Sequence, residues 1–324
     1  MAQAAMMTRT DNGIASLDAL YAEADRLDVT PGWIRREKPL LWREPSSRFL
    51  PAHWSYPAIK NALDAAGGLI DVSLAERRNL VLRNPFAGNG FATTATFACA
   101  YQMILPGEAA PTHRHSPHAL RVIIDAEGAY SVVDGEKTPM ETGDVVLTPG
   151  WCWHGHGHDG DAPAYWFDGL DVPMVHSLEP MFFEDHPDKY EKVARLAATS
   201  PYRFSRDAIA QRLDAAAADP EGLHGPRITL DAPDMPIMML TVERLMAGQK
   251  TRRQRSTANR VFVVMTGTGQ TIIDGKSMMW QPGDTLAVPT WTRFEHVASS
   301  DTVLFAMSDE PLMRFAKYYR VEFD

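Results

Sequence analysis

The chain has 324 residues, of which 45% are hydrophobic and 23% charged, a composition typical of soluble globular proteins with room for two domains. A formal net charge of −9 without any Lys/Arg run argues against nucleic-acid binding, and no apolar run approaches the length of a membrane span. The two cysteines exclude a disulfide framework, and the first twelve residues lack a signal-peptide pattern, so we expect a cytoplasmic protein.

The N-terminal region, residues 1–85, is predicted to be a helical and extended arm. Apolar residues recur at helical spacing in residues 16–27 and 56–66, and two glycines follow the second stretch. The segment between them, residues 31–54, is rich in Trp and Pro. Such an aromatic segment is predicted to pack as an extended arm.

Residues 86–187 are predicted to form a domain of short strands. Turn-forming Gly and Asp-Gly pairs separate the predicted strands, which are residues 94–105, 119–124, 129–133 and 144–148. A helical linker is expected over residues 188–235, with helices at 188–198 and 205–218 and Ser205 as the N-cap of the second.

The last region, residues 236–324, repeats the pattern of the first strand domain. The two copies share an Arg-led apolar strand, a Gly, an Asp-Gly, a Gly-Asp and a Pro, at Arg121, Gly128, Asp134, Gly143 and Pro149 and again at Arg260, Gly267, Asp274, Gly283 and Pro289. An internal duplication is the simplest explanation. We therefore predict an all-β dominated fold of two jelly-roll barrels.

Three histidines in the first strand domain have the spacing of a metal site. His113 and His115 are two residues apart, so on a strand both imidazoles point to the same face. His154 follows on a later predicted strand and can complete the set. Three neutral imidazoles suit a divalent transition metal, and their number alone does not select iron over manganese or zinc.

The glycine and histidine spacing around this trio resembles the two motifs of the cupin superfamily, and the duplication then resembles a bicupin. Many cupins add a Glu ligand on the following strand, where this chain has Arg121. A guanidinium cannot ligate a metal, but it can pair with a carboxylate in a fork geometry. A three-histidine site beside an arginine favours an anionic bidentate ligand.

A narrower resemblance, to the gentisate and salicylate 1,2-dioxygenase family, spans nearly the whole chain. It is carried by residues 106–121, 153–157 and 166–171, with further matches at 75–78, 82–85, 280–289 and 305–311. The resemblance implies one Fe(II) per chain, held by His113, His115 and His154. It also implies a 2-hydroxybenzoate substrate, O2 as the second substrate, and ring cleavage between the carboxyl-bearing and hydroxyl-bearing carbons. No external reductant is required, and the chain contains no NAD or flavin motif. A homo-oligomer, a tetramer, is also implied.

Five further residues are assigned roles on this basis. We expect Arg121, and with it Arg77, to pair with the substrate carboxylate. His156, two residues after His154, is expected to contact substrate or transfer a proton. Gln102 is expected to contact substrate or O2, and Asp168 to accept a hydrogen bond from a ring substituent or to orient a ligand histidine.

The second barrel departs from the first at the ligand positions. Arg252 and Gln254, or their close neighbours, replace the His pair, and a lone His296 lies two residues out of register with His154. We therefore expect the second barrel to be structural and without metal.

The substrate and the enzyme class have named alternatives. Gentisate is the most common substrate that the resemblance implies. Ala98 predicts space for a larger ring substituent, as in 5-nitrosalicylate, 5-chlorosalicylate or 1-hydroxy-2-naphthoate. A metal-dependent sugar isomerase would need a Glu where Arg121 stands. A non-catalytic ligand-binding bicupin would not need an intact His trio.

Overall fold

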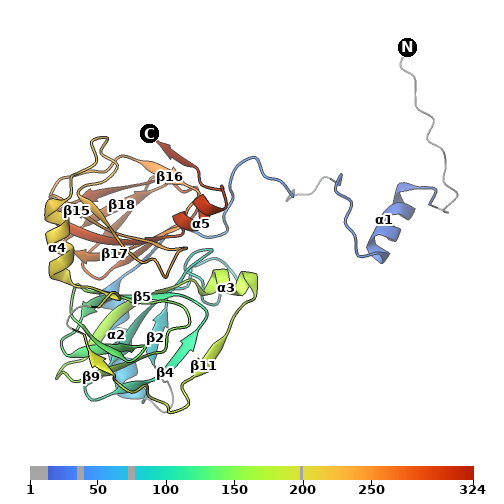
Figure 1. Ribbon diagram of the computed structural model, residues 1–324. Coiled ribbons are helices and arrows are strands. Elements are labelled where there is room, and N and C mark those ends of the chain that lie inside the picture. The colour runs from blue at the N-terminus through green and yellow to red at the C-terminus, as the bar shows by residue number, and fades with distance from the viewer. Residues whose placement is uncertain (1–13, 35–39, 72–76, 198–199) are drawn as a thin grey trace. The chain divides into compact units, whose positions relative to one another are not determined.

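A computed structural model of the chain describes residues 14–34, 40–71, 77–197 and 200–324, and its contacts divide the chain into two units, Met1–Glu44 and Pro45–Asp324 (Figure 1). The first unit contains helix α1 (Leu17–Arg26), where the predicted helix lies. Its N-cap is Ser16, whose hydroxyl accepts a hydrogen bond from the backbone N–H of Ala19. None of the described helices is long and apolar enough to cross a membrane.

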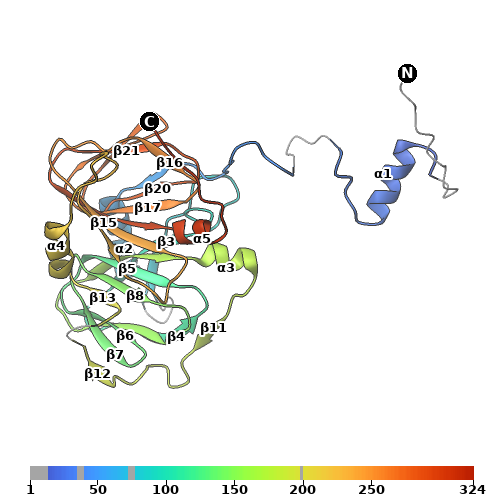
Figure 2. The same cartoon turned by 45° about the horizontal axis from the view of Figure 1, so that its top comes forward.

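The second unit contains two barrels, each built from two antiparallel-dominated sheets, and this confirms the predicted duplicated β fold (Figures 1 and 2). The strands of the first barrel are β2 (Arg78–Val81), β3 (Ala98–Ile104), β4 (Ala109–His115), β5 (Ala119–Asp125), β6 (Ala129–Val133), β7 (Glu136–Met140), β8 (Val145–Thr148), β9 (His154–His158), β10 (Ala164–Leu170), β11 (Phe183–Asp185), β12 (Arg195–Leu196) and β13 (Arg203–Phe204). Its sheets have the orders β13-β8-β5-β10-β3-β2 and β11-β4-β9-β6-β7-β12.

The second barrel has the sheet orders β1-β20-β17-β22-β15-β14 and β19-β18-β21-β16-β23. Its strands are β1 (Ala52–Trp54), β14 (Arg227–Leu230), β15 (Met239–Leu245), β16 (Gln254–Ser256), β17 (Arg260–Thr266), β18 (Gly269–Ile273), β19 (Lys276–Trp280), β20 (Thr285–Val288), β21 (Phe294–Ala298), β22 (Thr302–Ser308) and β23 (Val321–Phe323). The remaining helices are α2 (Tyr56–Leu69), α3 (Val172–Leu178), α4 (Arg206–Ala215) and α5 (Glu310–Phe315).

The two barrels turn the chain in the same way at equivalent places. Asp134 and Gly135 have φ values of 45° and 77°, and Asp274 and Gly275 have values of 46° and 80°. Two consecutive residues with positive φ make the tight hairpin turn that an Asp-Gly pair favours. The repeated sequence signal therefore corresponds to a repeated local structure.

The segment at 45–85, which we grouped with the N-terminal arm, lies in the second unit and contributes to both barrels. Strand β1 pairs with β20 of the second barrel, and β2 pairs with β3 of the first. The Asp284 carboxylate fixes this crossing, because it accepts a hydrogen bond from the backbone N–H of Tyr56 (2.8 Å) and lies 2.9 Å from Nε2 of His53.

Strand β3 is buried along its whole length because its two faces have different partners. Tyr101 and Met103 belong to the apolar core between the barrels, which also contains Phe167 of β10 and Phe305 of β22. Fully burying one such side chain contributes about 1.5–3 kcal/mol. The alternate residues of β3, among them Gln102, face the interior of the first barrel.

The predicted helix at 188–198 is wrong. The described residues of this segment are extended or irregular and include β12, which pairs in parallel with β7. Backbone groups of the segment form hydrogen bonds with the edge of the barrel. For example, the carbonyl of Lys189 in the segment accepts a hydrogen bond from the backbone N–H of Thr112 on β4. These tertiary bonds override the helical pattern of the side chains. The helix predicted at 205–218, with Ser205 as its N-cap, is confirmed by α4, which begins after Ser205 and lies beside both barrels (Figure 2).

Candidate metal centre

The three predicted ligands converge inside the first barrel. His113 and His115 come from β4 and His154 from β9, and the register of these strands places His113 opposite His154. One ligand nitrogen from each lies within 4.8 Å of the others. In the described part of the chain, no other group of three or more His, Cys, Asp or Glu side chains brings its ligand atoms so near to one another.

The hydrogen bonds of two ligands leave Nε2 for the metal. Nδ1 of His115 lies 2.8 Å from the carbonyl oxygen of Pro117, and Nδ1 of His154 lies 3.1 Å from that of Cys152. Each Nδ1 therefore carries the proton that it donates to a carbonyl. Nε2 of His154 is buried and has no hydrogen-bond partner among the described residues. An orphaned buried acceptor of this kind is what a metal ion would satisfy.

Burial and the neighbouring arginines keep the ligand imidazoles neutral. Burial is the main cause that lowers the pKa of His113 to about 2 and that of His115 to about 4. The pKa of His154 also lies well below its usual value, for the same reason and because of Arg121. Only the neutral imidazole can ligate a metal, so the donor set fits a divalent cation.

Arg77 lies directly beside the trio, just before β2. Its Nη1 is 2.8 Å from Nε2 of His113, and its Nη2 donates to the carbonyl of Pro111 at 3.3 Å. A metal that takes Nε2 of His113 would replace the first of these bonds. The guanidinium then remains next to the metal position as a permanent cation.

Arg121 lies on β5 with its side chain inside the barrel. Its Nη1 donates to the hydroxyl of Thr148 at 2.7 Å, and its Nε is 3.4 Å from Oδ1 of Asp168. Oδ1 of Asp168 also accepts a hydrogen bond from the indole N–H of Trp166 at 3.1 Å. Burial raises the pKa of Asp168 to about 6, against the opposing effects of Arg121 and Arg77.

A cavity of about 290 Å³ opens beside the His trio. Seven of the sequence-predicted positions line it, namely Arg77, Ala98, Gln102, His115, Arg121, His154 and Asp168. His113 is not on its wall, although its ligand atom belongs to the trio. Two arginines against one carboxylate make this cavity attractive to an anion.

His156 faces the barrel interior but does not line this cavity. It lies two residues beyond His154 on β9, its ring is 5.5 Å from that of Trp166, and it is buried. Neither ring nitrogen has a hydrogen-bond partner among the described residues. Burial and Arg121 hold its pKa well below the usual value, so the ring is neutral.

Several lining residues were missed in the sequence. They come from β2, β10, α3 and the loop before β3 and include Asn79, Val81, Phe91, Leu170, Val172 and His176. The rings of Phe91 and His176 contact each other edge to face at 5.1 Å. No spacing signal marks these residues, because they reach the cavity from elements outside the His-bearing strands.

In the second barrel, the residues at the positions equivalent to the His trio do not come together. Arg252 pairs with Glu221 at 3.2 Å, while Gln254 and the buried His296 line a separate cavity.

Comparison with known proteins identifies the family. Residues 100–172 match the Cupin_2 family, described as a cupin domain. The chain is 36% identical to gentisate 1,2-dioxygenase 1 of Aquipseudomonas alcaligenes over 93% of this chain and 94% of that protein. It is 31% identical to 5-aminosalicylate 1,2-dioxygenase of Comamonas sp. over 97% of this chain and 92% of that protein.

A solved structure agrees with the sequence relatives. The crystal structure of salicylate 1,2-dioxygenase from Pseudoaminobacter salicylatoxidans, determined as adducts with gentisate, superposes with a TM-score of 0.86. It is 27% identical and covers 98% of this chain and 96% of that one. From the whole-length relatives and the paired barrels with one His trio, we conclude that the chain belongs to the gentisate and salicylate 1,2-dioxygenase family of bicupins.

Proposed function

We propose that the chain is a ring-cleaving dioxygenase. It inserts both atoms of O2 into a 2-hydroxybenzoate and opens the ring between the carboxyl-bearing and hydroxyl-bearing carbons. The observation that carries this proposal is the His trio beside Arg121, because a guanidinium at that place recruits a carboxylate next to the metal.

Fe(II) is the metal that we propose, with one ion per chain held by His113, His115 and His154. Three neutral nitrogen donors without a carboxylate leave the ion its full positive charge, which favours an anionic bidentate substrate. The bound ion supplies the redox chemistry that joins O2 to the aromatic ring. The substrate itself provides the four electrons, so no second cofactor is needed.

The arginines bind and orient the substrate. Arg121 has Thr148 and Asp168 as fixed partners, so its guanidinium is held in place before substrate arrives. Arg77 adds a second positive charge to the same cavity, beside His113. We propose that these two cations fix the substrate carboxylate and thereby the position of the ring bond that breaks. Gln102, from β3, is proposed to contact the substrate or O2.

His156 is proposed to move a proton during ring opening. Its ring is neutral, and both nitrogens are without partners among the described residues, so one can accept a proton while the other donates. It stands behind His154 rather than on the cavity wall, so we propose that a water molecule connects it to the substrate.

The ring substituent of the substrate faces Ala98. This residue lines the cavity opposite Leu170 in the pairing of β3 with β10. A methyl side chain leaves space for the 5-substituent of gentisate or of 5-chloro- and 5-nitrosalicylate, and for the second ring of 1-hydroxy-2-naphthoate. We place gentisate and the 5-substituted salicylates first, because they fit a single-ring cavity of about 290 Å³.

The decisive experiment is O2 uptake by the protein after anaerobic loading with Fe(II). The panel contains gentisate, salicylate, its 5-amino, 5-chloro and 5-nitro derivatives, and 1-hydroxy-2-naphthoate. Uptake of one O2 per substrate, with loss of the aromatic absorbance, supports the proposal. If no 2-hydroxybenzoate in the panel causes uptake, the proposed function is wrong.

We also propose a cytoplasmic homo-oligomer, a tetramer. The first unit carries large apolar side chains that are exposed in the single chain, such as Trp33 at 66% and Leu41 at 89%. Exposed apolar side chains in a cluster are typical of association surfaces. Both cysteines are free, which suits a reducing compartment. Light scattering on the eluting protein measures the number of chains.

A further inference from the structure

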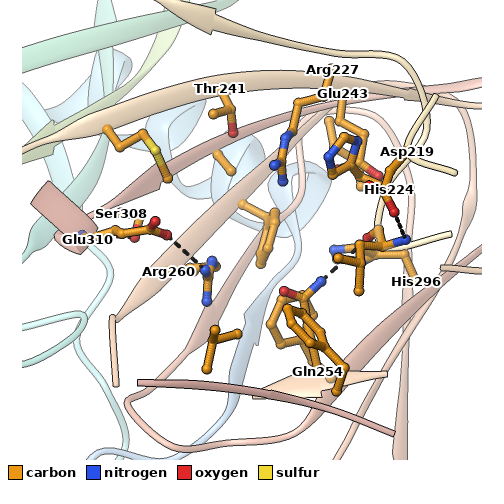
Figure 3. Close-up of a pocket in the computed structure, with 18 of the residues that line it drawn as sticks. Asp219, His224, Arg227, Thr241, Glu243, Gln254, Arg260, His296, Ser308 and Glu310 are labelled. Carbon is orange, nitrogen blue, oxygen red and sulfur yellow. Dashed lines mark hydrogen bonds and ion pairs between the residues drawn. The ribbon is translucent and has the colours of Figure 1, made fainter. Parts of the chain in front are cut away.

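The second barrel encloses a cavity that the proposed function does not use (Figure 3). Its volume is about 340 Å³, compared with about 290 Å³ for the cavity beside the His trio. Phe262, Phe294 and Leu304, all buried, form apolar wall, and the C-terminal strand β23 covers one side. The space is therefore suited to the body of a small organic molecule.

His296 presents a hydrogen-bond donor to this cavity. It is 2% exposed, its Nδ1 is 2.8 Å from the hydroxyl oxygen of Thr271, and Nε2 has no partner among the described residues. The same hydroxyl accepts the indole N–H of Trp280 at 3.0 Å. The Thr271 hydroxyl must then donate its proton to Nδ1 of His296, because Thr271 is fully buried and a buried hydroxyl proton without an acceptor would destabilise the fold. Nε2 therefore carries the imidazole proton.

Arg260 lines the same cavity and is held by fixed partners. It is 5.7 Å from the ring of Phe294, and that ring is 5.4 Å from the ring of His296. Arg260 donates a hydrogen bond to the hydroxyl of Ser256 at 2.5 Å. It also forms an ion pair with Glu310 at 3.3 Å, which Figure 3 draws as a dashed line. A guanidinium has five N–H groups, so donors remain for a ligand.

The other charges of the cavity leave one arginine without a close partner. Glu310 is neutralised by Arg260 and Arg314, with which it pairs at 3.3 and 2.6 Å. Arg227 lies across the strand pair from Glu243, but in the part of the chain that the structure describes its guanidinium makes no hydrogen bond or ion pair. Its side chain points into the cavity beside Glu243 in Figure 3. Arg227 thus offers a positive charge to an incoming ligand.

We propose that this cavity binds a small organic carboxylate with a single apolar ring, independently of the metal centre. The carboxylate accepts hydrogen bonds from Nε2 of His296 and from Arg260, and Arg227 adds positive charge. The ring of the ligand packs on Phe262 and Phe294, because aromatic side chains offer large apolar surfaces that favour contact with another ring. A sugar would leave its hydroxyl groups against apolar walls. A metal is not favoured, because the two histidines and three carboxyl groups of this cavity do not gather into a group of three potential ligands.

The test uses the full chain and benzoates without the 2-hydroxyl group. Crystals are soaked with 4-bromobenzoate, and anomalous scattering locates the bromine. We expect a bromine peak in the second-barrel cavity, in contact with the wall that Phe262 and Phe294 form. In solution, titration of 4-fluorobenzoate followed by fluorine NMR counts the sites and gives the dissociation constant. In His154→Ala, which lacks one metal ligand, the second-barrel site should remain.

Three variants assign the binding to the named residues. Arg227→Met should weaken binding at the second-barrel site by about tenfold, the effect of losing one charged contact. His296→Phe, which keeps a ring and removes the donor, should weaken it at least as much. Arg244→Met is the matched control, because Arg244 lies on the same sheet, pairs with Asp214 and does not line the cavity. It should bind as the wild type does.

The proposal is wrong if no bromine peak appears in the second barrel, or if Arg227→Met binds with wild-type affinity and stoichiometry. Arg227 is an exposed residue, so we expect its variant to fold, and it keeps the proposal testable where His296→Phe does not fold. Neither result depends on O2 uptake, and the outcome is therefore separate from that of the dioxygenase test.

Discussion

Arg121 and Asp168 lie directly opposite each other on the neighbouring strands β5 and β10, and their side chains form a buried ion pair. The Nε to Oδ1 distance is 3.4 Å, and the two residues are 3% and 6% exposed. In the low dielectric of the barrel neither charge is well solvated, so each depends on the other. The residue that we propose to bind substrate is thus also part of the packing of the fold.

Replacing Arg121 by Met should lower the free energy of unfolding by about 3–5 kcal/mol, because the substitution leaves the Asp168 carboxyl buried without its partner. Urea unfolding of the metal-free protein measures the change. Arg121→Lys should retain most of the stability but raise KM for the substrate at least tenfold, since an ammonium cannot make the two-pronged contact.

The double variant Arg121→Met/Asp168→Asn separates the two roles of the pair. It should recover a large part of the lost stability, because no isolated charge remains in the barrel. It should not recover kcat/KM. Recovery of activity together with stability would contradict the assignment of Arg121 to substrate binding.

His154→Ala should abolish metal binding. Removal of one of three ligands leaves two imidazoles, which cannot retain a divalent ion against a chelator. Metal content after dialysis should fall from about one per chain, the value expected from a single ligand trio, to a small fraction. The melting temperature of the variant should no longer rise on addition of Fe(II), whereas that of the wild type should. His158→Phe, on the same strand, should retain the metal.

The sequence was sufficient to predict the His trio because a two-residue spacing on a strand and the surrounding turns are local signals. The Asp-Gly turns at Asp134 and Asp274 are local in the same sense, and they revealed the duplication. Arg121 was predictable for a related reason, since it holds a fixed place in the strand that follows the pair.

Other features depend on contacts between distant segments, which no local pattern encodes. The segment at 188–198 has helical spacing, yet its backbone bonds to the edge of the first barrel. His176 reaches the cavity from a helix that follows the barrel, and the pairing of β1 with the second barrel joins residues more than two hundred positions apart. Such relationships follow from the tertiary fold alone.

The free energy of unfolding should change with pH in part because Glu243 is buried in the folded protein. Burial raises the pKa of this carboxyl to about 7 from a usual value of 4.5, although Arg227 and the N–H of Gly225 act in the opposite direction. The folded state therefore holds the proton more tightly than the unfolded state. The stability from this group is fully present below pH 4.5 and is lost as the pH rises through about 7.

The Glu243→Gln variant lacks this dependence. The difference in unfolding free energy between wild type and variant should therefore fall by on the order of 3 kcal/mol between pH 4.5 and pH 8. Urea titrations of both proteins across this range measure it, and other titrating groups cancel in the difference. A difference that stays constant with pH would show that the carboxyl has an ordinary pKa.

His156→Phe should lower kcat by on the order of a hundredfold and leave KM nearly unchanged, as expected for loss of a proton-transfer group. The substitution preserves the ring contact with Trp166 and removes both nitrogens. Metal content should remain that of the wild type. A raised KM with normal kcat would instead assign His156 to substrate binding, and normal values of both would leave it a packing residue.

Ala98 should determine which ring substituents the enzyme accepts. A larger side chain at this position would project from β3 into the cavity, toward Leu170 on the adjacent strand. Ala98→Leu should therefore reduce kcat/KM for 5-chlorosalicylate and 1-hydroxy-2-naphthoate far more than for unsubstituted salicylate. A single methylene of steric conflict corresponds to a factor of about 10–200 in such a ratio. Ala100→Val, on the same strand and also on the cavity wall, is the control for a general loss of space. If Ala98→Leu lowers kcat/KM for all substrates by the same factor, the substituent binds elsewhere in the cavity, and the selectivity must be sought at residues such as Val172 or His176.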